Sequence, residues 1–74
     1  MHKYYVYILQ SIEHPEKHYV GYTTNLEKRL KEHNKETQIY SKRYAPWEIK
    51  TYTCFSDEKK AKDFEKYLKS HSGR

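Results

Sequence analysis

The chain has few of the residues that cross-link proteins or form turns, namely cysteine, glycine and proline. Its 74 residues include one cysteine, two glycines and two prolines. A single cysteine, Cys54, excludes an internal disulfide and any zinc site built from several cysteines, and it is typical of a reducing compartment. Because Cys54 stands between Thr53 and Phe55 in an apolar-looking segment, we expect a buried and unreactive thiol.

Long hydrophobic runs are also absent. The most apolar segment stops at Leu9, which is too short for a cleaved signal sequence and far too short to span a bilayer. We therefore expect no membrane association and a cytoplasmic location. The sequence has no internal repeat and no low-complexity linker, so we expect one small domain over residues 1–74 with a thin core.

The chain is rich in basic residues and in tyrosine. Fifteen Lys and Arg residues against ten Asp and Glu residues give a net charge of +5, and nine residues are tyrosine. A small basic domain favours anionic partners, of which nucleic acid is the commonest, although a solvated basic surface explains the charge about as well. An aromatic content of 16% argues against an unfolded chain, and the scarcity of aliphatic residues excludes a helical bundle.

The pattern of apolar and polar residues predicts three strands. Segments rich in Tyr, Val, Ile and Thr lie at residues 3–10, 18–22 and 47–55, and the first two form a hairpin around a polar turn. In the third strand, alternation places five side chains on one face: Trp47, Ile49, Thr51, Thr53 and Phe55. We expect the first two of these to share one core with Phe64 and Leu68.

Residues typical of helix N-termini predict two helices. Thr24 and Glu27 form a capping box, so a helix is expected to begin at Thr24 and to end near Asn34. Residues 56–58 are a serine followed by two acidic residues, which predicts a second helix ending near Ser70. The order strand, strand, helix, strand, helix predicts an α+β fold: a three-stranded antiparallel sheet flanked by helices.

The second predicted helix carries a carboxylate on its inner side. Ala61, Phe64 and Leu68 form an apolar arc, and Glu65 lies within this arc or at its edge. A carboxylate in that position is costly without a partner. Two interpretations stay open: Glu65 pairs with a lysine or reaches solvent, or it is a metal ligand or acid–base group at the rim of the sheet.

The first predicted helix has the same peculiarity. Leu26, Leu30 and His33 fall on one face, with Arg29 along its edge. A core histidine and a salt-bridged arginine would each be ordinary. Arg29, His33 and Glu65 turned towards one sheet could instead hold a scissile phosphate, with arginine as a bidentate clamp and glutamate as ligand of a hard divalent cation.

Tyrosines on the first two strands supply candidates for a proton acceptor. Tyr5 and Tyr7 alternate on the first strand, and Tyr19 lies on the second. From composition alone, each is more often an amphipathic core aromatic with its hydroxyl at the surface.

Two tripeptides resemble the paired signature of the GIY-YIG nuclease superfamily. They are Tyr-Val-Tyr at residues 5–7 and, after eleven residues, Tyr-Val-Gly at residues 19–21. The segment 23–34 resembles the first helix of that family, and Glu65 stands at the position of its metal-binding glutamate. The first tripeptide lacks the Gly and Ile of the signature, but the ordered set covers nearly the whole chain. The chain is most similar to the small single-domain bacterial members.

The resemblance implies a metal-dependent endonuclease that hydrolyses DNA phosphodiester bonds, with structure-specific action in repair or recombination. Tyr7 and Tyr19 would line the site, and Tyr19 would be closest to the attacking water. Arg29 would bind the scissile phosphate, His33 would assist, and Glu65 would hold one Mg²⁺ or Mn²⁺ ion. We expect Tyr7, Tyr19, Arg29 and Glu65 to converge on one solvent-reachable face of the sheet, with His33 beside them. The remaining residue implied at the site is Gly21, which would allow close packing beside it.

The resemblance also bears on partners. We expect a monomer that binds DNA. Either a protein partner supplies the specificity, or the chain binds DNA through its own basic side chains, namely Lys28, Lys31, Lys35, Lys42 and Arg43. Members of this kind often continue past a Gly-Arg pair with an apolar, basic tail, so we expect a chain truncated at its C-terminus. The alternative to an enzyme is a nucleic-acid-binding module of the same fold with little or no catalysis. The complete set of tyrosines, arginine and glutamate favours the enzyme.

Overall fold

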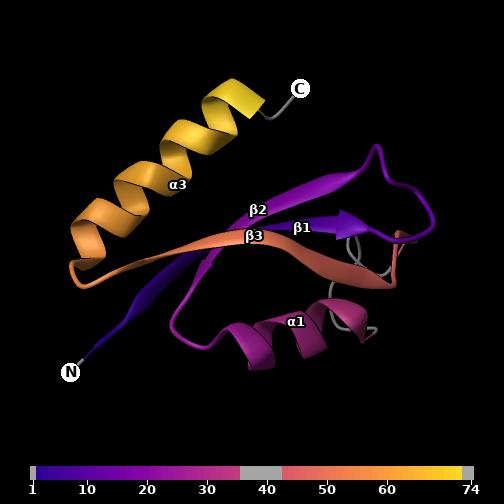
Figure 1. Ribbon diagram of the computed structural model, residues 1–74, viewed down its shortest axis with the longest axis horizontal. Helices are drawn as coiled ribbons and strands as arrows, with labels where there is room; N and C mark the ends of the chain where they lie inside the picture. The colour runs from indigo at the N-terminus through magenta and orange to yellow at the C-terminus, as the bar shows by residue number, and fades with distance from the viewer. Residues whose placement is uncertain (1, 36–42, 73–74) are drawn as a thin grey trace.

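The structure is a computed structural model that describes residues 2–35 and 43–72. In these residues the predicted order of elements is confirmed, and the helices lie on opposite sides of a three-stranded sheet (Figure 1). The elements are β1 (Tyr4–Ser11), β2 (His18–Thr23), α1 (Leu26–Asn34), β3 (Trp47–Phe55) and α3 (Glu58–Ser72). No helix in the described part of the chain is both long and apolar enough to cross a membrane.

The sheet is antiparallel with strand order β2-β1-β3, so β1 is its central strand. Tyr7 of β1 lies opposite Gly21 on β2 and Tyr52 on β3. Because directly opposed residues point to the same side of a sheet, these three positions share one face. We call it the α1 face, since α1 packs against it, and we call the other the α3 face.

The third strand does not keep one face towards one helix. Ile8 pairs with Thr51, whereas Leu9 pairs with Ile49, so Lys50 is an extra residue in a β-bulge. The bulge reverses the alternation. Trp47 and Ile49 therefore share the α1 face, while residues 51, 53 and 55 share the α3 face, and the prediction of one common face is wrong.

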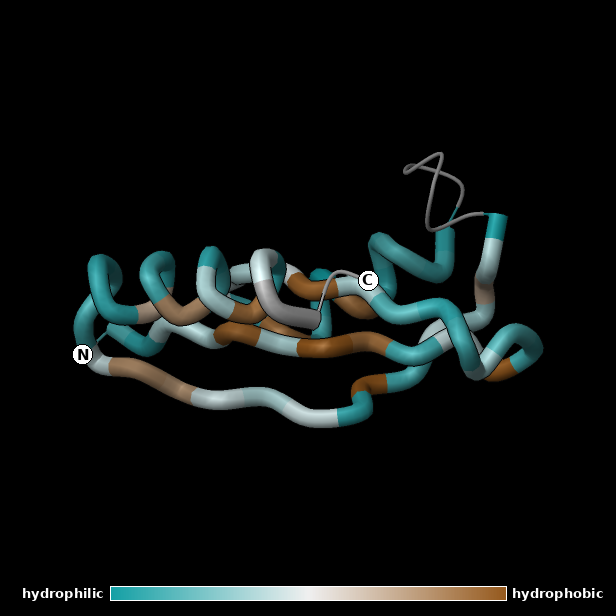
Figure 2. Tube along the Cα trace, turned by 90° about the horizontal axis from the view of Figure 1, so that it is seen from above, coloured by the Kyte–Doolittle hydropathy of each residue, from teal (hydrophilic) through white to brown (hydrophobic). Residues whose placement is uncertain are grey.

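Two separate apolar layers result. On the α1 face Tyr7, Leu9 and Trp47 are buried, and Leu26 and Leu30 of α1 pack against them. Figure 2 shows hydrophobic segments along the middle of the sheet and hydrophilic turns on the outer sides of the helices.

On the α3 face the ring centroids of Phe55 and Phe64 lie 5.5 Å apart, and Val6 and Ala61 are buried. The prediction of one core shared by Trp47 and Phe64 is therefore wrong, because the sheet lies between them.

The start of α1 also differs from prediction. The N-cap residue is Asn25, whose Oδ1 accepts from the backbone N–H of Lys28 at 3.1 Å. Thr23 holds this cap in place, because its hydroxyl oxygen accepts from the backbone N–H of Asn25. The side chain of Asn25 thus replaces the predicted cap Thr24, so the N-cap lies one residue later and the helix begins at Leu26.

The thiol of Cys54 is exposed, so the prediction of a buried cysteine is wrong. Cys54 lies opposite Tyr5 on the α1 face. The apolar-looking sequence around it belongs to a strand end that neither helix buries, since residues 51–54 are all exposed.

Candidate active site

A chain of hydrogen bonds joins the first strand to the first helix on the α1 face. The hydroxyl oxygen of Tyr7 lies 3.0 Å from Nε2 of His33, and Nε of Arg29 donates to the same oxygen at 3.4 Å. Helical spacing of four residues brings Arg29 and His33 to the same side of α1, directly over β1. The structure therefore brings Tyr7, Arg29 and His33 together on this face.

Tyr19 completes this group from the second strand. Its ring stacks beside Tyr7 with centroids 6.4 Å apart, and its centroid lies 4.5 Å from that of His33. Tyr19 is partly exposed, whereas Tyr7 and His33 keep only 1% and 0% of their surface in contact with solvent. Substrate can therefore reach Tyr19 more readily than the two side chains beneath it.

Burial decides the protonation of Tyr7 and His33, which we call the inner pair. Desolvation lowers the pKa of His33, and the positive charge of Arg29 lowers it further, against an opposing effect of Glu32. Burial raises the pKa of the Tyr7 hydroxyl more than Arg29 lowers it. Both groups are therefore neutral near pH 7.

Neutrality assigns the direction of the hydrogen bonds. A guanidinium can only donate, so Tyr7 accepts from Arg29 and has its own O–H available for Nε2 of His33. The proton of His33 then sits on Nδ1, a buried atom that has no hydrogen-bond partner within the described residues.

Arg29 also borders an open cavity of about 360 Å³ at the start of α1. The guanidinium group is partly exposed and pairs with Glu32, with 3.1 Å between Nη1 and Oε1. The hydrogen bond to Tyr7 raises the pKa of Arg29, so its charge is permanent. The cavity is lined by polar and charged side chains, namely Thr23, Thr24, Asn25, Lys28, Arg29 and Glu32.

Glu65 reaches the site from the other side of the sheet. It lies on α3, its side chain is 21% exposed, and its carboxylate pairs with Lys69 at 3.0 Å. The prediction that it shares one face with Arg29 is wrong, because α3 packs on the α3 face. The helix does turn Glu65 inwards, and its charge contributes to the raised pKa of Tyr7. It is therefore within electrostatic reach of the cluster.

The donor set limits the kind of metal that could bind. In the described residues, no group of three or more His, Cys, Asp or Glu side chains is arranged to hold a metal ion. Among the predicted site residues, Glu65 is the one that carries a carboxylate, a hard ligand. This fits Mg²⁺ or Mn²⁺ only where phosphate oxygens and water complete the coordination shell, which is the usual arrangement for Mg²⁺ at phosphate-transfer sites.

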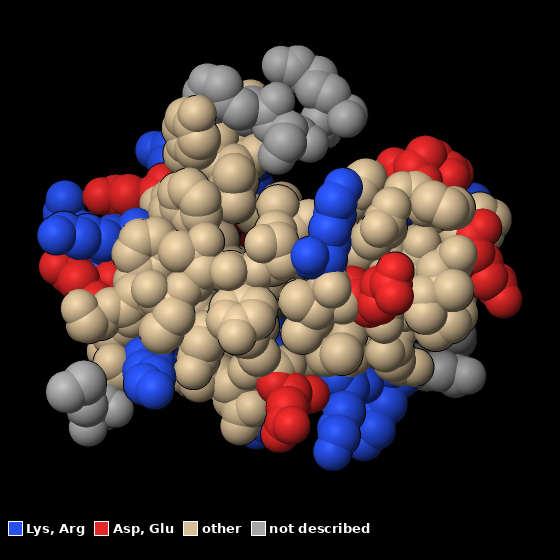
Figure 3. All heavy atoms as spheres, viewed as in Figure 1, with Lys and Arg blue, Asp and Glu red and all other residues tan. Residues whose placement is uncertain are grey.

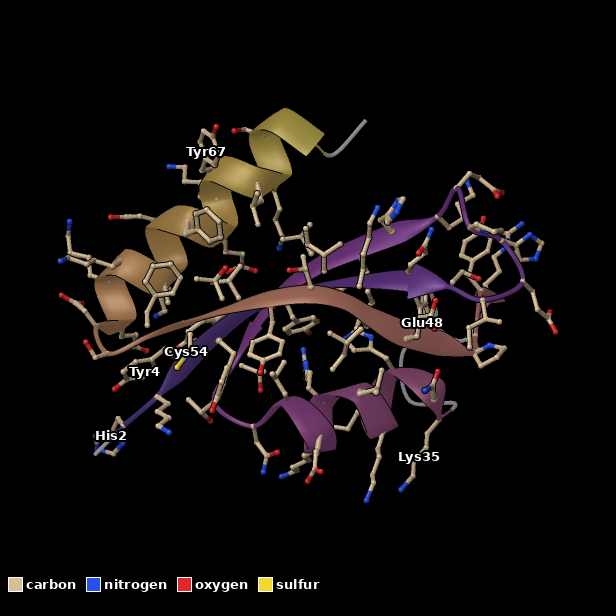
Figure 4. The ribbon with its side chains drawn as sticks, viewed as in Figure 1. His2, Tyr4, Lys35, Glu48, Cys54 and Tyr67 are labelled. Carbon is tan, nitrogen blue, oxygen red and sulfur yellow. The ribbon has the colours of Figure 1, made fainter. Side chains whose placement is uncertain are left out.

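The predicted basic residues do not form one patch at the cluster. Lys28 lines the cavity, whereas Lys31 and Lys35 are exposed, and Lys35 points away from the sheet (Figure 4). Figure 3 shows basic side chains on the outer side of α1. Arg43 is exposed, with its guanidinium carbon 5.9 Å from the ring centre of Tyr44. Lys42 lies outside the described residues.

Three residues of this region were not predicted. Glu32 pairs with Arg29, Lys69 pairs with Glu65, and Asn34 binds the backbone of Trp47. The first two follow helical spacings of three and four residues, so the spacing could have revealed them. The contact of Asn34 joins elements far apart in sequence and has no local signal.

Comparisons with known proteins find one matching family model and several similar chains. A family model described as GIY-YIG catalytic domain matches residues 3–74. A UPF0213 protein of Haloquadratum walsbyi is 34% identical over 70 residues, which are 93% of this chain and 76% of that protein. A UPF0213 protein of Bacillus licheniformis is 40% identical over 55 residues, which are 73% of this chain and 57% of that protein.

A solved structure is similar as well. The solution NMR structure of a UPF0213 protein from Bacillus halodurans matches 92% of this chain and 71% of that chain, with a TM-score of 0.56 and 27% sequence identity. Each of these three relatives is thus longer than the segment that it shares with this chain.

Proposed function

The chain belongs to the GIY-YIG family and is related to the UPF0213 proteins, and from this premise we propose that it is a divalent-metal-dependent endonuclease acting on DNA. The family is generally one of nucleases, and the domain match covers almost the whole chain. The observation that carries the proposal is Arg29, a charged side chain that is fixed by Tyr7 on one side and opens to a basic cavity on the other.

Arg29 is suited to bind the scissile phosphate. Its planar guanidinium group can form two parallel hydrogen bonds to phosphate oxygens, and Lys28 adds a second positive charge in the same cavity. A fixed cation placed where negative charge develops is usually the largest contribution to catalysis of this kind.

The inner pair positions Arg29 and does not contact substrate. Tyr7 and His33 are almost fully buried, and their hydrogen bond fixes the oxygen that accepts from Arg29. Tyr19 packs on both rings and is partly exposed, so it can orient the attacking water next to the phosphate held by Arg29. We assign catalytic contact to Arg29 and Tyr19, and positioning to Tyr7 and His33.

Glu65 is the residue that would hold a divalent cation, with phosphate and water as the other ligands. Such an ion, when bound, neutralises negative charge on the phosphate. Holding it requires Glu65 to leave its ion pair with Lys69, whose side chain is exposed whereas that of Glu65 is largely buried.

The test is cleavage of branched, nicked and linear DNA in the presence of Mg²⁺ or Mn²⁺. We expect wild-type protein to cut at least one of these substrates and Glu65→Gln to cut none while it keeps its fold. The matched control is Glu58→Gln, which changes a carboxylate of the same helix that binds Tyr22 and Lys62 instead. Equal loss in both variants would contradict a metal role for Glu65.

A second candidate is a DNA-binding module without catalysis. It is favoured by the ion pair of Glu65 with Lys69 and by the position of α3 on the side of the sheet opposite α1, which carries Arg29 (Figure 1). Salt-sensitive DNA binding that depends on Arg29 and Lys28, together with no cleavage under any metal condition, would establish this alternative.

A further inference from the structure

A pair of tyrosines, one of them exposed, lies on the α1 face beside the candidate active site. The ring centroids of Tyr5 and Tyr52 are 5.9 Å apart with an interplanar angle of 69°, and Tyr52 keeps 54% of its surface in contact with solvent. The exposed Cys54 lies opposite Tyr5. We call Tyr5, Tyr52 and Cys54 the tyrosine patch.

The tyrosine patch continues directly from the catalytic cluster. Tyr52 is the β3 partner of Tyr7, and Tyr5 lies two residues before Tyr7 on the same face of β1. On the other side of β1, Tyr5 is opposite Thr23, which lines the cavity that holds Arg29. A single surface thus runs from the basic cavity, across β1, to an exposed aromatic ring on β3.

An exposed tyrosine by itself requires no explanation. Tyr67 of α3 is equally exposed at 54%, and its ring stacks on Phe64 of the same helix with centroids 6.3 Å apart. Figure 4 shows Tyr67 pointing away from the sheet. Tyr52 differs because its ring partner Tyr5 lies opposite Thr23, which lines the cavity beside Arg29. Aromatic rings next to a cationic track are the combination by which proteins bind single-stranded nucleic acid, and sheet surfaces can present such rings to bases.

We propose that the tyrosine patch is a stacking site for an unpaired nucleobase adjacent to the phosphate bound by Arg29. The inference rests on the proposed function and specifies its substrate: a DNA strand that is single or locally unpaired at the site. In a continuous duplex both faces of each base are covered by neighbouring bases, so only an unpaired base can present a face to Tyr52. Stacking is tolerant of sequence, because every base has an aromatic face.

The test measures binding in the presence of EDTA, so that cleavage does not contribute. Fluorescence anisotropy compares a short labelled oligo-dT strand, an abasic strand of the same length and charge, and a blunt duplex. We expect Tyr52→Ala to weaken binding of oligo-dT by about 5- to 150-fold, which is the range for loss of one stacked base. Binding of the abasic strand and of the duplex should not change.

Two variants serve as controls. Tyr67→Ala removes a ring of equal exposure from α3 and should leave oligo-dT binding unchanged. Tyr52→Phe keeps the aromatic face and should bind like wild type, whereas Tyr52→Leu keeps apolar bulk without that face and should bind like Tyr52→Ala. This comparison decides the question even if the alanine variant does not fold.

Equal weakening on the abasic strand, or no weakening on oligo-dT, would overturn the stacking site. The proposed nuclease activity is measured separately, with metal, on wild-type protein. Cleavage without any effect of Tyr52 on oligo-dT binding rejects the stacking site alone. A Tyr52-dependent preference for oligo-dT without cleavage rejects the nuclease alone.

Discussion

Tyr7 and Gly21 face each other across β1 and β2, and the phenol ring of Tyr7 occupies the space where a side chain of Gly21 would begin. The glycine has no positive φ angle, so its role is steric and not conformational. Any Cβ at position 21 would overlap the hydroxyl and the adjacent ring carbon of Tyr7. The absence of a side chain therefore lets the hydroxyl reach His33 and Arg29.

We predict that Gly21→Ala destabilises the domain by about 1–3 kcal/mol, the usual cost of forcing a group into a packed core. Urea unfolding measures this loss. Alanine is otherwise favoured over glycine within a strand. Consequently, the same substitution on a Tyr7→Ala background should be neutral or stabilising. Equal cost on both backgrounds would show that the steric relationship between the two positions is not the cause.

Stability should fall in mild acid because His33 is buried and neutral. Its pKa in the folded protein lies below its ordinary value of about 6.5, whereas the unfolded chain takes up a proton near that value. The unfolded state thus binds more protons as the pH drops through about 6.5, and the stabilisation present above that pH is lost progressively below it.

We expect the denaturation midpoint to decrease between about pH 7 and pH 5, a window that brackets the ordinary histidine pKa. His33→Asn should flatten this dependence, although it lowers overall stability by removing the bond to Tyr7. The control, His18→Gln, alters an exposed histidine on β2 and should keep the wild-type slope. An unchanged slope in His33→Asn would mean that other groups dominate the acid response.

The sequence predicted the order of elements and the inner face of α1 because both depend on local periodicity. Leu26, Leu30 and His33 do face the sheet, and Arg29 does lie at the edge. The bulge at Lys50 could not be predicted, since an extra residue in one strand appears only when its partner strand is known.

The same reason explains the error over Glu65. A helical wheel shows that its side chain turns towards the sheet, but not which face of the sheet the helix covers. That choice depends on the connection between β3 and α3 and on the packing of Phe64 against Phe55. Local periodicity therefore found the inward carboxylate but could not place it relative to Arg29.

Asn34 should be a structural requirement of the site. Its Oδ1 accepts from the backbone N–H of Trp47 at 2.6 Å, and its Nδ2 donates to the carbonyl of the same residue at 3.3 Å. This pair joins the end of α1 to the start of β3, one residue after His33. Asn34→Ala should lower the free energy of unfolding by about 1–3 kcal/mol, because two part-buried backbone groups lose their partner.

Urea unfolding measures that loss. The variant Asn34→Asp separates the contribution of the accepted hydrogen bond from that of the donated one. Aspartate keeps the acceptor for Trp47 N–H and loses the donor, so its stability should lie between wild type and the alanine variant. Lys35→Ala, at the next and exposed position, should be close to neutral. An alanine variant as stable as wild type would show that water replaces the side chain of Asn34.

Glu32 should oppose DNA binding at the site. Its carboxylate pairs with Nη1 of Arg29, so a phosphate must displace it to occupy both arms of the guanidinium fork. The pair is about one-third exposed, and pairs of this kind are worth less than about 1 kcal/mol. Glu32→Gln should therefore tighten DNA binding by about two- to five-fold at low ionic strength.

The comparison variant is Glu27→Gln, which removes the same charge from an exposed position in the first turn of α1. A general gain in positive charge would affect both variants equally, whereas displacement from Arg29 predicts a larger gain for Glu32→Gln. The difference should shrink as salt screens the partly exposed pair. Weaker binding by Glu32→Gln would instead show that Glu32 orients Arg29 towards the phosphate, because loss of orientation would then outweigh loss of competition.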